Sequence, residues 1–207
     1  MSDARQDICD AAIHIFQRRL TDGAGGNFSV RREHRIYCTP QGAASRHWWR
    51  LVPEQIIVTT EDGDRLSGSG EFSREWAMHL AIYREFAAVA AVVHAHAENI
   101  MVFAHLARPI PPTSEQTDRW GVVPVCEEHA SHTPELAAAV VETLRPQAAG
   151  LPDRVMTVLI PRHGIVIAGA DLHQCVEALD GIDQSCRILV ARAALLAAEA
   201  DGAGGVR

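Results

Sequence analysis

Ala91-Val92-Val93-His94-Ala95-His96 predicts a short buried strand that ends in two histidines. Residues two apart on a strand point to the same face, so His94 and His96 can converge on one ion from a rigid edge. A pair of this kind is equally typical of exposed or hydrogen-bonded histidines. Other segments of the chain must therefore show whether this strand carries a metal site.

Two further segments supply the remaining ligands of a metal site. Glu75 lies at a predicted helix start, in Ser73-Arg74-Glu75-Trp76, and His163 lies in the predicted turn Pro161-Arg162-His163-Gly164. Three neutral imidazoles and one carboxylate form a ligand set typical of zinc. The chain contains no lysine, which excludes carbonyl chemistry through a lysine Schiff base and favours a metal acting as Lewis acid.

The other eight histidines have no partner at chelating spacing. His79 lies one helical turn after Glu75 and could orient it, although a packed or solvated role is the more typical one. His129 and His132 are interpreted as surface-loop residues, because Pro134 argues against a helix there. The remaining five are His14, His34, His47, His105 and His173.

Helical and strand patterns alternate along the chain, which predicts one layered α/β or α+β domain over residues 1–200. Glycine- and proline-rich segments separate the elements. Residues 201–207 are predicted to be a flexible tail. Helices are expected at 3–20, from Ser73, at 97–106, from Thr133 and at 171–200, and strands at 27–31, 35–39, 55–59, 91–95, 122–125, 155–160 and 165–168.

Composition excludes several classes of protein. The formal net charge of -7 makes nucleic acid an unexpected partner. No apolar run approaches 18 residues and no basic-then-apolar segment begins the chain, so we expect no membrane contact and a cytoplasmic location. The five cysteines are odd in number and form no Cys-x-x-Cys pair, which favours reduced thiols.

Three polar segments together suggest a phosphate pocket. Gly25-Gly26-Asn27 permits close backbone approach and offers an amide donor, and Thr39-Pro40-Gln41-Gly42 is a second small polar turn. Ser73 and Arg74 lie at a predicted helix N-terminus, where free N–H groups favour an anion. Each segment alone is more often a turn or a cap, and Arg74 could equally face solvent.

The order of these motifs resembles the zinc-dependent class II aldolase/adducin family, which includes the L-fuculose-phosphate aldolases. The resemblance covers roughly residues 5–200. It rests on the Gly-Asn-Phe-Ser turn, the Thr-Pro-x-Gly turn, the Ser-x-Glu-Trp helix start, the His-x-His strand and the His-Gly turn. It implies an α/β/α sandwich with a mostly antiparallel central sheet, and a homotetramer with active sites at subunit interfaces.

Carried over by position, the resemblance implies residue roles. His94, His96 and His163 would bind Zn²⁺, with Mn²⁺ or Co²⁺ left open. Glu75 would be the fourth ligand at rest and the acid/base during turnover. The residues expected around the substrate phosphate are Gly26, Asn27, Gln41, Gly42, Ser73 and Arg74. Gln41 and Arg74 depart from the family, which often has Thr or Ser at the first position and Ser at the second.

The expected reaction is reversible cleavage of a ketose 1-phosphate to dihydroxyacetone phosphate and an aldehyde. Fuculose-phosphate aldolases use two tyrosines for the aldehyde half of the substrate, one after the metal histidines and one in the C-terminal tail. In this chain Glu115 lies about where the first tyrosine would fall, and the tail from Asp171 onward has no tyrosine. That loss favours a less polar substrate, such as a 5-deoxypentulose 1-phosphate. Glu115 as acid/base keeps open a methylthioribulose-1-phosphate dehydratase. A sugar-phosphate 4-epimerase and a non-catalytic adducin-like assembly module also stay open.

Overall fold

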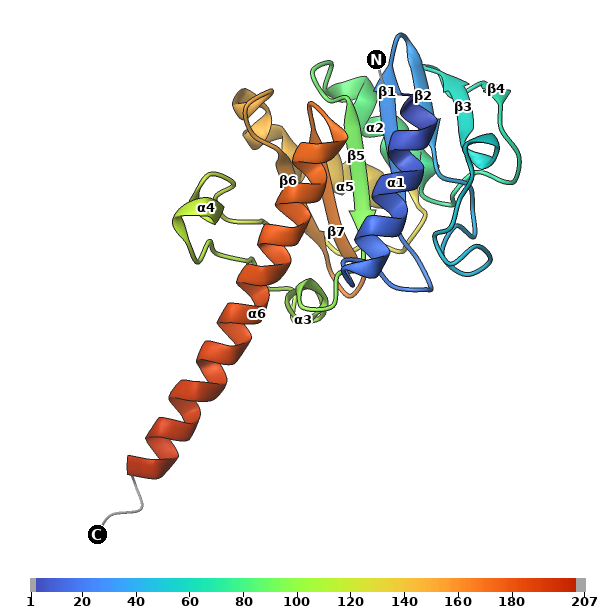
Figure 1. The fold of residues 1–207 in the computed structure, drawn as a ribbon. Helices are drawn as coiled ribbons and strands as arrows, with labels where there is room; N and C mark the ends of the chain where they lie inside the picture. The colour runs from blue at the N-terminus through green and yellow to red at the C-terminus, as the bar shows by residue number, and fades with distance from the viewer. Residues whose placement is uncertain (1–2, 204–207) are drawn as a thin grey trace.

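A seven-stranded sheet forms the middle layer of the protein (Figure 1). The computed structural model describes residues 3–203. The strands lie in the order β4-β3-β2-β1-β5-β7-β6, and each neighbouring pair is antiparallel. Their bounds are β1 (Asn27–Arg32), β2 (Arg35–Cys38), β3 (Ile57–Thr60), β4 (Arg65–Ser67), β5 (Ala91–Ala95), β6 (Met156–Ile160) and β7 (Gly164–Gly169).

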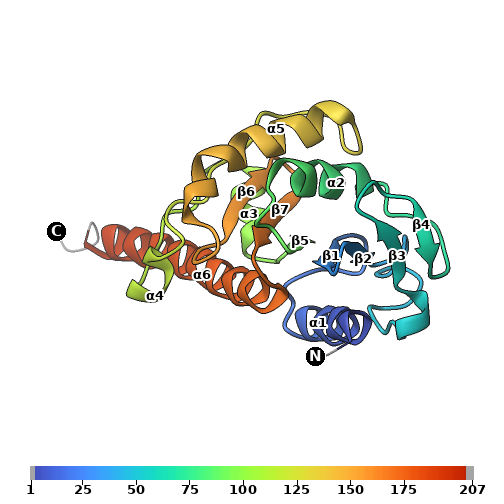
Figure 2. The same cartoon turned by 90° about the horizontal axis from the view of Figure 1, so that it is seen from above.

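Helices cover both faces of the sheet, so the predicted α/β/α sandwich with an antiparallel sheet is confirmed (Figure 2). Helices α1 and α6 lie on one face, and α2 and α5 lie on the other. The bounds are α1 (Ala4–Gln17), α2 (Trp76–Glu85), α3 (Ile100–His105), α4 (Glu115–Asp118), α5 (Pro134–Leu144) and α6 (Leu172–Ala203), with short 3₁₀ turns at Pro53–Gln55 and Arg145–Gly150.

Strand β5 is buried on both faces, which makes its end a rigid platform. Val93 packs into the apolar cluster under α1 and α6, whereas Val92 packs into the cluster under α2 and α5. Both side chains are fully buried. Each such burial stabilises the fold by roughly 1.5–3 kcal/mol. Because neighbouring residues alternate between faces, His94 points to the same face as Val92, toward α2.

Strand register brings distant parts of the sequence to the end of β5. Strand β1 pairs with β5 so that Asn27 lies opposite His94. Strand β7 pairs with the other edge of β5 and begins at Gly164. His163 occupies the turn between β6 and β7, one residue before that start. The histidines are therefore neighbours in space because of how the sheet is ordered.

Helix α2 begins later than the sequence predicts. Its first helical residue is Trp76, and Glu75 occupies the cap position with φ of -99°. The Ser73 hydroxyl accepts a hydrogen bond from the Glu75 backbone N–H at 3.2 Å, so Ser73 caps the turn before the helix and not the helix itself. Arg74 consequently does not stand at a first helical position. The turn carries the Glu75 carboxylate inward.

Other predicted elements also differ from the structure. Residues 122–125 form no strand; they make isolated bridges from Val123 to Ile110 and from Val125 to Leu159. Pro124 lacks an N–H group and so cannot continue a ladder on both sides. Helix α3 is shorter than residues 97–106. Strand β4 was not predicted, because its three residues are all exposed and show no apolar alternation.

Helix α6 projects beyond the body of the protein (Figure 1). Its first half packs on the sheet through residues such as Cys175 and Leu179, whereas its side chains are exposed from Val190 to Asp201. The helix extends to Ala203, past the predicted start of the tail, and residues 204–207 lie outside the described part of the chain. All five cysteines are buried and unpaired. No helix among the described residues is long and apolar enough to cross a membrane.

Candidate metal centre and active site

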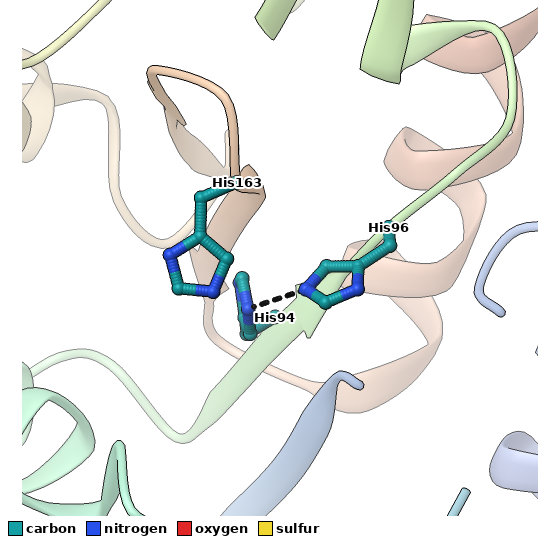
Figure 3. A group of neighbouring side chains, drawn as sticks. All are labelled: His94, His96 and His163. Atoms are coloured by element: carbon teal, nitrogen blue, oxygen red, sulfur yellow. Dashed lines mark hydrogen bonds between the residues drawn. The ribbon is translucent and has the colours of Figure 1, made fainter. Parts of the chain in front are cut away.

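Three histidine rings meet at the end of β5 (Figure 3). His94 and His96 come from β5 and the residue after it, and His163 comes from the turn before β7. One ring nitrogen from each lies within 4.8 Å of the others. The Nε2 atoms of His94 and His96 are 3.2 Å apart. The structure thus brings together the three histidines that the sequence singled out as ligands.

The Glu75 carboxylate completes this cluster. Its Oε2 atom lies 3.1 Å from His94 Nε2, and its Oε1 atom lies 3.1 Å from His163 Nε2. The side chain is only 6% exposed. Burial alone would raise the pKa of Glu75, but the imidazoles of His94 and His163 and the Asn27 amide outweigh burial and hold the pKa well below its usual range. The carboxyl is therefore ionised.

The outer nitrogen of each imidazole has a polar neighbour that fixes the ring. His94 Nδ1 lies 3.0 Å from the Ile165 carbonyl oxygen, to which it donates. His96 Nδ1 lies 3.4 Å from Asp22 Oδ2, and His163 Nδ1 lies 3.4 Å from Ser131 Oγ. Such outer contacts set the tautomer of a ligating histidine and leave the lone pair of Nε2 pointing inward.

The inner atoms of this cluster fit a divalent cation. With Nδ1 protonated on His94 and His96, two lone pairs face each other across 3.2 Å. Glu75 Oε1 is buried and has no hydrogen-bond partner among the described residues, although His163 Nε2 lies 3.1 Å away as an ion-pair contact. Burial lowers the pKa of His94 to about 3, so the ring is neutral. Converging lone pairs beside an ionised carboxylate are stabilised by a shared positive charge.

Glycines make room for the rings. A Cβ atom on Gly25 would lie 2.2 Å from Cε1 of His96, and a Cβ atom on Gly164 would lie 2.5 Å from the Ala95 carbonyl oxygen. Gly26 adopts a φ of +96° that other residues rarely take. The Gly-Gly-Asn and His-Gly motifs are therefore required by the packing of the imidazoles, whatever else they bind.

Asn27 and His79 form a buried layer next to Glu75. Asn27 Nδ2 donates to Glu75 Oε2 at 2.9 Å, and Asn27 Oδ1 lies 2.6 Å from His79 Nε2. Burial lowers the pKa of His79 to about 4, so this ring is neutral. The spacing of four residues predicted that His79 could orient Glu75. In the structure the two side chains are linked through Asn27, which bonds both.

His132 is a site residue that sequence reasoning missed. Its Nδ1 atom lies 3.9 Å from Glu75 Oε1, and its ring centroid lies 6.4 Å from that of His163. The backbone of His132 has a φ of +68°, in the left-handed region. Pro134 correctly predicted a helix start after this loop, but nothing in the local pattern indicates where the loop points.

The predicted phosphate-binding segments lie side by side. The Gln41 backbone N–H donates to the Glu71 carbonyl oxygen at 2.8 Å, and Pro40 bridges to Phe72. This contact places the turn containing Gln41 and Gly42 beside the turn containing Ser73 and Arg74. The Arg74 side chain is exposed and makes no hydrogen bond or ion pair within residues 3–203. Its free guanidinium remains available to an anion.

Glu115 is not brought to the histidines of its own chain. It is the first residue of α4, where its side chain is exposed and makes no hydrogen bond or ion pair in the described structure. Helix α4 packs against α6. A role for Glu115 at the histidine cluster would require a second subunit.

The family model described as "Class II Aldolase and Adducin N-terminal domain" matches residues 6–190. The chain belongs to this family. A 5-deoxy-D-ribulose 1-phosphate aldolase of Bacillus thuringiensis serovar kurstaki is 29% identical over 81% of this chain and 74% of that protein. A 3-oxo-tetronate 4-phosphate decarboxylase of Cupriavidus necator is 28% identical over 90% of this chain and 83% of that protein.

The fold also matches solved structures of the class II aldolase family. An L-fuculose 1-phosphate aldolase superposes with a TM-score of 0.81 at 25% identity, covering 94% of this chain and 88% of that one. The expected resemblance to the class II aldolases and the fuculose-phosphate aldolases is confirmed. The relatives differ in reaction, since both aldolases and decarboxylases are among them. Family membership therefore leaves the reaction of this chain to its own site residues.

Proposed function

We propose that the protein is a metal-dependent aldolase that reversibly cleaves a ketose 1-phosphate to dihydroxyacetone phosphate and an aldehyde. The observation that carries this proposal is the Glu75 carboxylate, ionised and buried, with its two oxygens each 3.1 Å from an imidazole nitrogen. A proton-transfer group beside a three-histidine cluster suits chemistry at the carbon next to a ketone.

His94, His96 and His163 would hold the ion, with Glu75 as the fourth ligand before substrate binds. Zn²⁺ fits this donor set best, and Mn²⁺ or Co²⁺ could replace it. When bound, the ion supplies Lewis-acid stabilisation of the negative charge that develops on the ketone oxygen. The ionised Glu75 side chain would move a proton without leaving the cluster.

In the synthetic direction, Glu75 removes a proton from the hydroxymethyl carbon of dihydroxyacetone phosphate. The carbanion then forms a bond to the aldehyde carbon, and the aldehyde oxygen takes a proton from a donor such as the Glu115 side chain or solvent. Cleavage runs through the same steps in reverse. Because Glu115 lies away from its own histidines, this part of the proposal includes a homotetramer with active sites at subunit interfaces.

The phosphate would be bound where the two polar turns meet. Gly26, Gln41 and Gly42 supply backbone and amide groups, Ser73 supplies a hydroxyl, and Arg74 supplies a charge-assisted contact. The Asn27 amide is partly committed, because it already bonds Glu75 and His79. The similarity to a 5-deoxy-D-ribulose 1-phosphate aldolase supports a 5-deoxypentulose 1-phosphate as substrate.

The decarboxylases among the relatives make a second candidate. Loss of the carboxyl group from a 3-oxo-tetronate 4-phosphate leaves the same three-carbon keto phosphate that aldol cleavage leaves. Both reactions break a carbon–carbon bond of the carbon α to the ketone, on its side away from the ketone. Both then protonate that α carbon. They differ in the leaving fragment, which is an aldehyde in one case and carbon dioxide in the other. Glu75 can serve either reaction.

One product assay separates these possibilities. The metal-loaded protein is supplied with 5-deoxyribulose 1-phosphate, fuculose 1-phosphate, methylthioribulose 1-phosphate or 3-oxo-tetronate 4-phosphate. A reductase specific for dihydroxyacetone phosphate reports carbon–carbon cleavage, and aldehyde and carbon dioxide are measured separately. We expect dihydroxyacetone phosphate and an aldehyde from a 5-deoxyketopentose ester, and condensation of the two products in reverse.

Three other results would overturn the aldolase proposal. Carbon dioxide with dihydroxyacetone phosphate from the oxo acid alone would establish the decarboxylase. A product that has lost water but kept its carbon skeleton would establish the dehydratase. A protein that binds no metal and converts none of the four esters would favour the adducin-like assembly module.

A further inference from the structure

Five buried polar side chains form a ladder between α2 and β1. Glu75 at the N-cap of α2, and His79 and Tyr83 within the helix, are spaced four residues apart, so they lie on one face. Asn27 and Ser29 are spaced two residues apart on β1, so they also share a face. The two faces meet, and each side chain of one bonds a side chain of the other.

The contacts of this ladder are short and shielded from water. From Glu75, the chain of contacts runs 2.9 Å to Asn27, 2.6 Å on to His79, 2.6 Å on to Ser29 and 2.9 Å on to Tyr83. All five side chains are at most 6% exposed. Because water cannot replace a lost partner there, each broken contact leaves a buried polar group unsatisfied.

The ionised Glu75 carboxylate at one end of the ladder fixes the direction of every hydrogen bond in it. An ionised carboxylate only accepts, so Asn27 must turn its N–H group toward Glu75 and its carbonyl oxygen toward His79. That oxygen only accepts, so His79 Nε2 must carry the proton. Neutral His79 then accepts at Nδ1 from the Ser29 hydroxyl, and the Ser29 oxygen accepts from Tyr83.

We propose that His79, Ser29 and Tyr83 are positioning residues that hold the Asn27 amide with its N–H group toward Glu75. The rotated amide would place its oxygen against the carboxylate, and both groups would then accept without a donor between them. The ladder excludes this rotation, because His79 offers a donor on the side where the rotated amide would also have a donor. The Glu75 carboxylate is thereby held in one orientation beside the histidines.

This inference rests on the proposed function, in which Glu75 moves the proton, so the first test uses turnover. His79→Leu replaces the ring by an apolar side chain of similar size, which removes the donor to Asn27. His79→Gln, a separate variant, replaces the ring by an amide that can still donate. We expect His79→Leu to lower kcat on the order of 10-fold with little change in KM, as is typical for a group behind a ligand. His79→Gln should recover most of the loss.

The matched control is Ile82→Ala, a truncation of a fully buried apolar side chain on the same helix that has no polar group and so no hydrogen bond in the ladder. It should lower the thermal unfolding midpoint and leave kcat unchanged. Equal losses of kcat in Ile82→Ala and His79→Leu would assign His79 a packing role and overturn the proposal. If His79→Leu does not fold, Tyr83→Phe removes only the last hydroxyl and should lower kcat by about 2-fold.

A second test does not depend on activity. Nitrogen NMR of ¹⁵N-histidine-labelled protein reports the tautomer of each ring, and the His79 signals are assigned by their loss in His79→Gln. We expect neutral His79 protonated at Nε2, in the wild type and in Tyr83→Phe. Protonation at Nδ1 would reverse every bond of the ladder and overturn the proposal. If no ester is turned over, the proposed function fails while this measurement still decides the ladder.

Discussion

The two halves of the candidate site are built differently. The histidine half, defined as Glu75, His94, His96 and His163, consists of side chains at strand ends and at a helix start, each in contact with another member. The loop half, defined as Gln41, Arg74 and Glu115, consists of exposed side chains on turns and a short helix start. No hydrogen bond or ion pair within residues 3–203 fixes the side chains of the loop half.

This difference teaches where reaction and substrate are specified. A rigid half whose side chains are buried or partly buried can position a metal and a proton-transfer group to within a fraction of an ångström. Exposed side chains on turns can change without disturbing the core, so substrate preference is free to vary there. This division accounts for relatives that are named as aldolases and as decarboxylases within one family. If the two halves are as separate as their geometry indicates, a change in one should leave the other intact.

The largest effect is expected from removing two ligands of the histidine half. The variant His94→Ala, His96→Ala should lose both its bound metal and its activity, because one imidazole and one carboxylate hold a divalent ion weakly. Metal content per chain by plasma mass spectrometry, with wild type near one ion, checks this. His105→Ala, an exposed histidine on α3, is the control and should keep both. Full metal occupancy in the double variant would exclude this site.

Glu75→Gln should keep the fold and much of the metal but lower kcat by ~10²–10⁴-fold. The amide fills the same volume and can still contact Asn27, but it cannot take up and return a proton. Glu115→Gln, measured beside it under saturating substrate, should cost much less. The reverse result, with Glu75→Gln near wild type and Glu115→Gln inactive, would move the acid/base to α4 and favour the dehydratase.

The same division explains what the sequence could predict. His94 and His96 were identifiable because a short apolar strand fixes which way its side chains point, and Thr133-Pro134 predicted a helix start that the structure has, with Thr133 as its cap. The helix start predicted at Ser73 was wrong, because the Ser73 hydroxyl caps the turn before the helix, and the local sequence does not distinguish such a cap from a cap of the helix itself. His132 and Glu115 depend on how loops fold back over the sheet, which no local periodicity encodes.

Two neighbouring glycines test how tightly the histidine half is packed. Gly25→Ala places a methyl group 2.2 Å from the His96 ring, so the ring must move away from the cluster. We expect metal affinity to fall by ~10–100-fold, as when a ligand loses its orienting contact. Gly23→Ala is the matched control, since its Cβ atom would meet only the Trp48 ring at 3.5 Å. Equal metal affinity in the two variants would mean that His96 is not held where the structure places it.

Arg74→Ala tests the loop half. The substitution should raise KM for a ketose 1-phosphate by about 10-fold and change kcat little, because a phosphate contact is largely the same in the ground and transition states. Arg84→Ala, at the other end of α2, should change neither constant. Steady-state kinetics on the phosphate ester and on the unphosphorylated ketose provide the check. If the free ketose were used as well as the ester, the anion pocket would be wrong and Arg74 would be a solvated surface residue.

The smallest effect concerns His132, which lies on a turn yet comes within 3.9 Å of Glu75. Asparagine tolerates its left-handed backbone and stays polar but is too short to reach the carboxylate, so His132→Asn removes the contact without straining the loop. A contact of this length at a partly exposed ring is worth ~0.2–1 kcal/mol, or less than about 5-fold in kcat/KM. His129→Asn, three residues earlier in the same loop, is the control. Suppose that metal content is unchanged and that the loss of kcat/KM differs between substrates that release an aldehyde and those that release carbon dioxide. His132 would then belong to the loop half and would be a determinant of substrate. If His132→Asn instead loses metal, His132 belongs to the histidine half. That half would then include a loop residue as well as the side chains at the strand ends and the helix start.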